Sequence, residues 1–176
     1  IMIIKTDFKD LVIIKKKNFF DKRGYFQEIY AEKKLKKKFV FTVMSYSKKN
    51  VLRGLHIQTK KPQGKMITVL KGKIFDVALD LRKNSKTFGK VYKCILSDKN
   101  SKSIFIPEGF AHGFYTLSKE NYVTYSCTNY RNQSSETTIK FDDESLKIKW
   151  PFKKMIISKK DKIGISFSDY LKKINV

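Results

Sequence analysis

Histidine and cysteine are scarce in this chain of 176 residues. It contains two histidines, His56 and His112, and two cysteines, Cys94 and Cys127, which are far apart and form no CxxC pair. A three-histidine metal site is therefore impossible, and a cysteine zinc site or a disulfide is disfavoured. We expect no metal ligands and two reduced, buried thiols, as is typical of a cytoplasmic protein.

Long apolar segments are also missing. No apolar run approaches the roughly 20 residues of a membrane helix, so we expect no membrane partner. Residues 1–5 are too short for a signal peptide and lack a cleavage pattern. The glycines are too scattered for a dinucleotide-binding or Walker loop. These absences argue against membrane proteins and the common Gly-rich nucleotide folds.

Arginine is rare although the chain is strongly basic. Lysine and arginine total 39 against 16 acidic residues, a net charge of +23. The arginines are Arg23, Arg53, Arg82 and Arg131. Sequence-reading contacts with nucleic acids favour the arginine fork, and here the lysines are spread over the whole chain. We therefore expect no specific nucleic-acid partner, but a surface that attracts polyanions such as pyrophosphates.

Short strands separated by polar turns dominate the pattern. An apolar content of 41% indicates a folded protein, and the length suits one domain over residues 1–176. Strands are expected at 11–14, 25–30, 39–47, 50–58, 66–70, 73–81, 91–96, 103–106, 111–117 and 122–129. Helices are expected at 31–38 and 166–174, and a turn at 21–24. Residues 66–70 and 73–81 should pair as a hairpin across Lys71-Gly72. The pattern predicts an all-β sandwich or barrel.

The strand at 50–58 contains one of the histidines and one of the arginines. Strict alternation predicts one face with Val51, Arg53, Leu55 and Ile57, and the other with Leu52, Gly54, His56 and Gln58. A glycine beside the histidine leaves room for a ligand to approach the imidazole. A hydrogen-bonded core histidine is the alternative interpretation.

Several longer motifs resemble one known family. They are Arg53-Gly54-Leu55-His56-Ile57-Gln58, Gln63-Gly64-Lys65, residues 75–82, 85–89 and 106–114, Thr128-Asn129-Tyr130, Trp150-Pro151 and residues 158–161. In this order, from about Phe20 to Asp161, they are similar to the dTDP-4-dehydrorhamnose 3,5-epimerases, the RmlC family. The resemblance implies a cupin-type double-stranded β-helix, a jelly-roll barrel with short peripheral helices. It also implies a homodimer and no metal or other cofactor.

The family inverts C3 and C5 of a 4-keto sugar in a nucleotide-sugar substrate. Both carbons adjoin the C4 carbonyl, so inversion needs a base on one face, an acid on the other and a positive group at the enolate oxygen. By resemblance, His56 is the base and Asp161 orients its imidazole. Tyr125 is the acid, and Lys65 lies near the enolate oxygen. Without the resemblance, Tyr125 is an ordinary strand aromatic, Asp161 a turn or helix cap and Lys65 a surface lysine.

The resemblance also assigns a substrate-binding set. Arg53 and Arg23 match pyrophosphate-binding positions, with Arg23 reaching into the partner subunit's site. The other matching positions are Phe26, Glu28, His112, Tyr130, Glu136 and Lys160. Asp76 is expected to be the buried partner of a site residue that the sequence does not identify.

One departure from the family leaves the substrate open. The family usually has Gln and Asn, which help to bind the nucleotide, where this chain has Phe41 and Val43. Losing these amides removes hydrogen bonds to a polar base edge. A GDP-linked 4-keto heptose and a C3-only epimerase therefore remain alternatives. Outside this reaction, a sugar- or polyanion-binding β-barrel and a metal cupin oxygenase also remain open.

Overall fold

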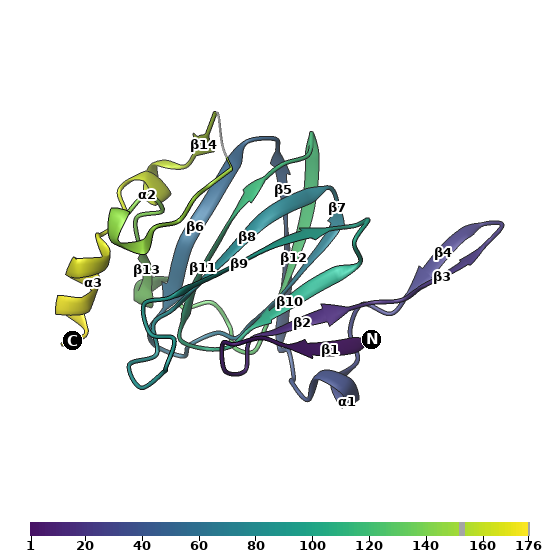
Figure 1. The fold of residues 1–176 in the computed structure, drawn as a ribbon, viewed down its shortest axis with the longest axis horizontal. Helices are drawn as coiled ribbons and strands as arrows, with labels where there is room; N and C mark the ends of the chain where they lie inside the picture. The colour runs from purple at the N-terminus through teal and green to yellow at the C-terminus, as the bar shows by residue number, and fades with distance from the viewer. Residues whose placement is uncertain (152–153, 176) are drawn as a thin grey trace.

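Two β-sheets lie face to face in the computed structural model, which describes residues 1–151 and 154–175 (Figure 1). The first sheet has the order β1 (Met2–Lys5), β2 (Val12–Lys15), β10 (Lys102–Ile106), β7 (Lys65–Lys71), β12 (Glu120–Cys127) and β5 (Phe41–Lys48). The second has the order β13 (Glu136–Thr138), β6 (Val51–Gln58), β11 (Phe110–Thr116), β8 (Lys73–Asp80) and β9 (Val91–Ser97), and β14 (Ile156–Ile157) also pairs with β6. β3 (Asn18–Asp21) and β4 (Gly24–Gln27) form a separate hairpin.

The helices are short and lie outside the sheets (Figure 1). They are α1 (Glu32–Leu35), α2 (Lys159–Lys162), α3 (Phe167–Lys173) and the 3₁₀ turns η1 (Gln133–Ser135) and η2 (Glu144–Leu146). The predicted all-β class, the turn at 21–24 and the terminal helix are confirmed. The helix predicted at 31–38 is shorter, because Lys36 adopts a left-handed conformation at its C-terminus. Within the described residues, no helix is both long and apolar enough to span a bilayer.

The predicted hairpin across Lys71-Gly72 is wrong. β7 pairs with β10 and β12, whereas β8 pairs with β9 and β11, so the turn carries the chain from one sheet to the other. Gly72 has a φ of +96°, and a Cβ there would lie 2.3 Å from the carbonyl oxygen of Glu120. The turn therefore needs glycine. A hairpin turn often needs glycine too, so the local sequence does not distinguish a hairpin from a connection between two sheets.

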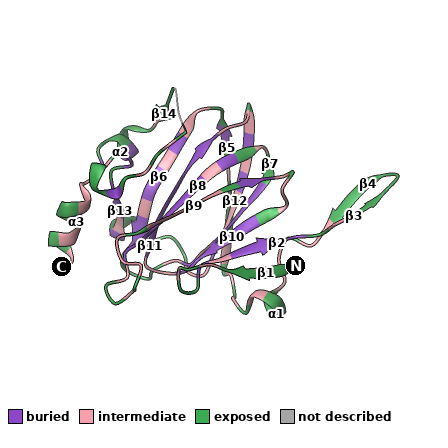
Figure 2. Cartoon of the chain, in the orientation of Figure 1, coloured by how far each residue is buried: buried purple, intermediate pink, exposed green. Residues whose placement is uncertain are grey.

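The core lies between the two sheets, where inward-facing side chains of both meet (Figure 2). Ile67, Val69 and Ile104 of the first sheet pack in one cluster with Ile74 and Phe114 of the second. This alternation of inward apolar and outward polar residues is the pattern from which the strands were predicted. Phe114 belongs both to this cluster and to the lining of a pocket between the sheets, so the core continues into the pocket wall.

The C-terminal segment covers the outer face of the second sheet. Tyr170 of α3 packs in a cluster with Leu55 and Ile57 of β6, and Ile139 forms an isolated bridge with Ile165. The backbone N–H of Ile165 donates to the carbonyl of Thr138. These contacts fix the segment that contains α2 beside β6.

A bulge in β6 breaks the predicted alternation. His56 pairs with His112 and Arg53 with Phe114, so β6 has one more residue than β11 between these pairs. The extra residue changes the phase, so Arg53 and His56 line the same pocket rather than opposite faces. Gly54 makes the bulge possible, since its φ is +113° and a Cβ there would lie 2.5 Å from the Cα of Gly113.

Candidate active site

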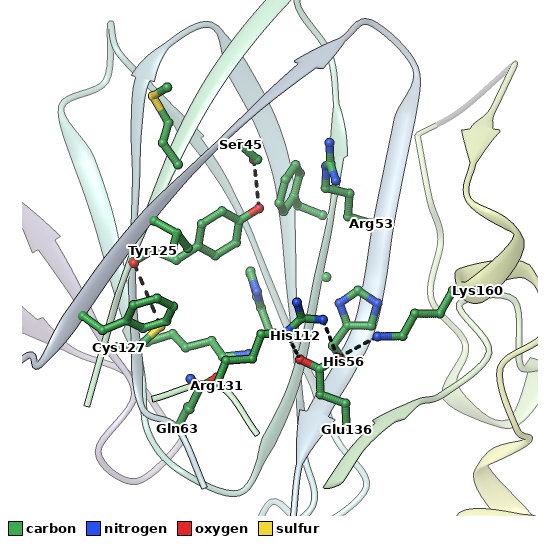
Figure 3. Close-up of a pocket in the computed structure, with 16 residues that line it drawn as sticks. Ser45, Arg53, His56, Gln63, His112, Tyr125, Cys127, Arg131, Glu136 and Lys160 are labelled. Atoms are coloured by element: carbon green, nitrogen blue, oxygen red, sulfur yellow. Dashed lines mark hydrogen bonds and ion pairs between the residues drawn. The ribbon is translucent and has the colours of Figure 1, made fainter. Parts of the chain in front are cut away.

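A pocket of about 400 Å³ opens between the two sheets (Figure 3). Strands β5, β7 and β12 of the first sheet and β6 and β11 of the second form its walls. The predicted site residues that line it are Arg53, His56, Lys65, His112, Tyr125, Glu136 and Lys160. Asp161 lies behind His56 rather than at the pocket surface.

His56 is held from behind by a buried carboxylate. Its Nε2 lies 2.5 Å from Oδ1 of Asp161, whose side chain is 6% exposed. Because an ionised carboxylate only accepts hydrogen bonds, Nε2 donates the proton and Nδ1 of the neutral ring is left as an acceptor. The side chain of His56 is 33% exposed, so the imidazole remains accessible from the pocket.

Asp161 owes its position to α2. The helix begins after Ser158, whose hydroxyl accepts the backbone N–H of Asp161 at 3.1 Å. The other carboxylate oxygen accepts the N–H of Gly54 in the bulge at 3.4 Å. Burial of Asp161 favours the protonated form, but the hydrogen bonds from His56 and Gly54 outweigh it and lower the pKa of the carboxyl. The carboxylate therefore stays ionised beside the imidazole.

Tyr125 faces His56 from the opposite wall. It lies on β12 of the first sheet, and its hydroxyl is 3.1 Å from the hydroxyl of Ser45 on β5 (Figure 3). Burial raises the pKa of Tyr125 to about 12, although Ser45 and Arg53 act in the other direction. The phenol therefore keeps its proton at neutral pH.

Lys65 is a half-buried cation of the pocket. Burial lowers the pKa of its ammonium group, and the nearby charges of Cys127 and Glu136 oppose this shift. An amine with a lowered pKa exchanges protons more readily than a surface lysine and gains from any negative charge that develops beside it.

The partner of Asp76 is His112. Nε2 of His112 lies 2.8 Å from Oδ2 of Asp76, and both side chains are at most 5% exposed. Oδ1 of Asp76 is buried and has no hydrogen-bond partner among the described residues. His112 of this second histidine–carboxylate pair lines the pocket on β11, and Asp76 lies behind it on the neighbouring strand β8.

The arginines of the pocket are held in different ways. Nε of Arg53 donates to the hydroxyl of Ser47 at 3.0 Å, and Nη2 donates to the carbonyl of Tyr46 at 3.2 Å, so its partners are uncharged. Arg131 instead forms two hydrogen bonds with Glu136. Lys160 binds the same carboxylate at 2.6 Å.

Four predicted binding residues lie outside the pocket. Arg23 and Phe26 lie on the β3–β4 hairpin, which projects away from the sheets, and Glu28 follows it (Figure 1). The side chain of Arg23 is 84% exposed and pairs with Asp21, while Glu28 pairs with Lys34. Tyr130 is exposed beside the pocket, with its ring centre 5.9 Å from that of Phe41.

Sequence reasoning missed several lining residues. They are Ser45, Met44, Gln63, Gly113, Phe114, Cys127 and Arg131. For Arg131, its rarity as an arginine in a lysine-rich chain was a usable signal. The others are strand or loop residues of ordinary type, and only the pairing of distant strands shows that they face the pocket.

Comparison with known proteins extends over nearly the whole chain. The family model described as dTDP-4-dehydrorhamnose 3,5-epimerase matches residues 5–169. This chain belongs to that family. The Methanothermobacter thermautotrophicus member of the family is 46% identical over 90% of each chain. A crystal structure of the Elizabethkingia anophelis dTDP-4-dehydrorhamnose 3,5-epimerase has a TM-score of 0.90 and 44% identity, covering 96% of this chain and 97% of that one.

A further epimerase structure contains a sugar nucleotide. The RmlC protein of Legionella pneumophila, solved in complex with dTDP-4-keto-L-rhamnose, has a TM-score of 0.91 and 41% identity. The match covers 95% of this chain and 93% of that one. The family resemblance expected from the sequence motifs is thereby confirmed.

Proposed function

We propose that this protein is a C3/C5 epimerase of a nucleoside-diphosphate 4-keto-6-deoxy sugar, converting dTDP-4-dehydro-6-deoxy-D-glucose into dTDP-4-dehydro-L-rhamnose. The observation that carries the proposal is the placement of His56 and Tyr125 on facing sheets of one pocket. A flat enolate between them is exposed to an acceptor on one side and a donor on the other, as inversion requires. Family membership favours this enzyme over a non-catalytic binding barrel or a metal oxygenase.

In the proposed reaction, Nδ1 of His56 removes the proton from C3 or C5. The electron pair moves into the C4 carbonyl and leaves an enolate, whose oxygen is stabilised by Lys65. Asp161 stabilises the imidazolium that forms, because its carboxylate accepts the Nε2 proton. The hydroxyl of Tyr125 then delivers a proton to the other face, and solvent restores the protonation of both residues.

The uncharged partners of Arg53 support its proposed role at the diphosphate. Its charge is available to a phosphate group, since no carboxylate pairs with it among the described residues. His112, Glu136 and Lys160 line the same pocket and complete the proposed substrate-binding set on this chain.

We also propose a homodimer built on a cupin-type double-stranded β-helix, one domain per chain. The β3–β4 hairpin supports the dimer because it leaves Phe19, Phe20, Tyr25 and Phe26 each more than half exposed. An isolated two-stranded hairpin is marginally stable in water, and a second copy would bury these rings. Arg23, Phe26 and Glu28 would then belong to the neighbour's site, with Tyr130 at the rim of the chain's own site.

A GDP-linked substrate, including a 4-keto heptose, is the second candidate. Phe41 and Val43 line the pocket, where the family usually has amides. Neither side chain offers a hydrogen bond to a base edge. A C3-only reaction uses the same groups and remains a variant of the proposal.

The deciding experiment incubates dTDP- and GDP-linked 4-keto sugars with the enzyme in D2O. Proton NMR should show loss of the C3 and C5 signals for the true substrate, with inverted product. His56→Asn should lower this exchange by about 10²–10⁴-fold while the fold and nucleotide affinity remain close to wild type. If no 4-keto sugar exchanges, the proposed reaction is wrong, and if His56→Asn exchanges at the wild-type rate, another residue is the base.

A further inference from the structure

Arg131 is a pocket cation that is paired with a carboxylate, which it shares with Lys160. Its Nε lies 2.6 Å from Oε1 of Glu136 and its Nη2 lies 3.0 Å from Oε2. The ammonium group of Lys160 binds Oε2 as well, at 2.6 Å. Glu136 thus accepts three charge-assisted hydrogen bonds, and its side chain is only 15% exposed.

These contacts fix the orientation of the guanidinium. The hydrogen bond from Arg131, assisted by the one from Lys160, lowers the pKa of Glu136 to about 2, so the carboxylate is ionised at any working pH. Its pairing uses the side edge of the guanidinium, formed by Nε and Nη2. The end edge is left for another acceptor, since Nη1 has no hydrogen-bond partner within the described part of the chain.

Because Glu136 stays ionised, its negative charge determines which kind of acceptor suits Arg131. A phosphate group beside Glu136 would meet a like charge at close range. Arg53, held by a hydroxyl and a carbonyl, has no such neighbour and is the better phosphate ligand. The end edge of Arg131 therefore suits an uncharged acceptor, such as a carbonyl oxygen.

Aromatic and apolar side chains line the same pocket as the Arg131–Glu136–Lys160 cluster. The preceding residue, Tyr130, is 65% exposed and packs its ring against that of Phe41. Along β5, Phe41 and Val43 pair with Cys127 and Tyr125, so all four side chains face the pocket. Ser45, which touches the Tyr125 hydroxyl, is about 13 Å further along the strand from Phe41. Phe41, Tyr130 and Arg131 thus lie at an exposed edge of the pocket, away from the Tyr125 hydroxyl. This edge suits a planar ring.

We propose that Arg131, oriented by Glu136, reads a keto group on the nucleobase of the substrate. The assignment rests on the proposed function and adds a specificity-determining residue to it. The keto group is at position 4 of a pyrimidine, as in thymine and uracil, or at position 6 of a purine, as in guanine. Cytosine and adenine present an amino donor at the same positions, which the N–H groups of Arg131 do not bind.

The test measures the affinities of matched nucleoside diphosphates by calorimetry. UDP and CDP differ at position 4, and inosine and adenosine diphosphates differ at position 6. The wild type should bind the keto member of at least one pair about tenfold or more tightly. Arg131→Met should bring that ratio close to one. Arg131→Lys retains the charge, so its affinity for inorganic pyrophosphate should be unchanged. A lysine cannot pair with Glu136 through two N–H groups, so its donor is not oriented and the ratio should fall.

Three outcomes overturn the assignment. A wild-type ratio near one for both pairs, or an unchanged ratio in Arg131→Met, means that Arg131 does not read the base. An equal loss of affinity for all four nucleotides and pyrophosphate makes Arg131 a phosphate ligand. Exchange at C3 and C5 in D2O, measured on the same wild-type preparation, tests the epimerase function separately.

Discussion

At the scale of single residues, access separates the two histidine–carboxylate pairs. The side chain of His56 is 33% exposed and that of His112 only 5%, although each lies within hydrogen-bonding distance of a buried aspartate. An imidazole that must reach a substrate carbon needs the first arrangement. The His112–Asp76 pair holds the pocket wall in place and presents little of the imidazole to a ligand.

Replacing Tyr125 by phenylalanine should separate proton exchange from inversion. The change removes one hydroxyl and almost no volume, so the fold should survive. In D2O the variant should still lose the substrate proton to His56 and regain deuterium on the same face, while net inversion falls by about 10²–10⁴-fold. NMR follows exchange and configuration together.

Tyr122→Phe is the matched control, because Tyr122 lies on the same strand and packs on Tyr46 with ring centres 5.1 Å apart. It should invert both carbons at the wild-type rate. If Tyr125→Phe does the same, the acid is another group, and Tyr130 is the next tyrosine to test.

At the scale of secondary-structure elements, the bulge in β6 decides whether the site exists. It brings Arg53 and His56 to one pocket and also supplies the Gly54 N–H that binds Asp161. Sequence periodicity located this strand and its histidine correctly. It placed Arg53 and His56 on opposite faces, because the extra residue is visible only against the partner strand β11.

Gly54→Ala should disrupt both stability and activity. Its Cβ would lie 2.6 Å from the carbonyl oxygen of His112, at a φ that alanine rarely adopts. We expect the free energy of unfolding to fall by roughly 2–4 kcal/mol. Urea denaturation measures the loss.

Gly24→Ala is the control, since Gly24 also has a positive φ but a Cβ there meets nothing within 4 Å. It lies in the projecting hairpin, so global stability should change by less than about 1 kcal/mol. Equal losses in the two variants would show that the close approach to β11 contributes nothing.

The ion pairs of Glu136 should make stability depend on pH in acid. Its pKa is lowered from 4.5 to about 2 by Arg131 and Lys160, so the stabilisation is complete above pH 4.5 and disappears as the pH falls toward 2. Glu136→Gln should therefore be less stable by about 1–2 kcal/mol at pH 7, with the difference vanishing near pH 2. Denaturant titrations across this range test the slope.

Glu120→Gln is the comparison, because Glu120 pairs with Lys71 and its side chain is 41% exposed, against 15% for that of Glu136. If the free energy of unfolding depends on pH in Glu136→Gln as it does in the wild type, the expectation is contradicted.

At the scale of the whole molecule, the strands and the motifs could be predicted from the sequence, whereas their assembly could not. Most strands were located by alternation and turn residues, but β1, β3, β13 and β14 were missed, since strands of two to four residues carry little periodicity. The pocket depends on which distant strands pair. Its motif residues came from the resemblance, while Arg131 and Ser45 required the three-dimensional structure.

The proposed dimer predicts complementation between inactive variants. If Arg23 completes the neighbour's site, a mixture of His56→Asn and Arg23→Ala subunits contains heterodimers with one intact site. With random exchange, half of the dimers are mixed, so about a quarter of wild-type activity should return. The assay is epimerisation after mixing and re-equilibration.

His56→Asn mixed with Asp161→Asn is the control. Both residues belong to one chain's pocket, so neither site of that heterodimer is intact and no activity should return. A fully active monomer in solution would contradict the shared site.

The passage of consecutive strands between the two sheets also affects how the chain folds. Lys48 of β5 pairs with Glu120 of β12, and Ile67 of β7 pairs with Ile104 of β10. Most of the large sheets thus consists of contacts between segments far apart along the chain. Such contacts form only after long loops have closed, and the entropy of closure is lost before packing compensates for it. Refolding should therefore take milliseconds to seconds rather than microseconds, with the pocket assembled late because its walls come from both sheets.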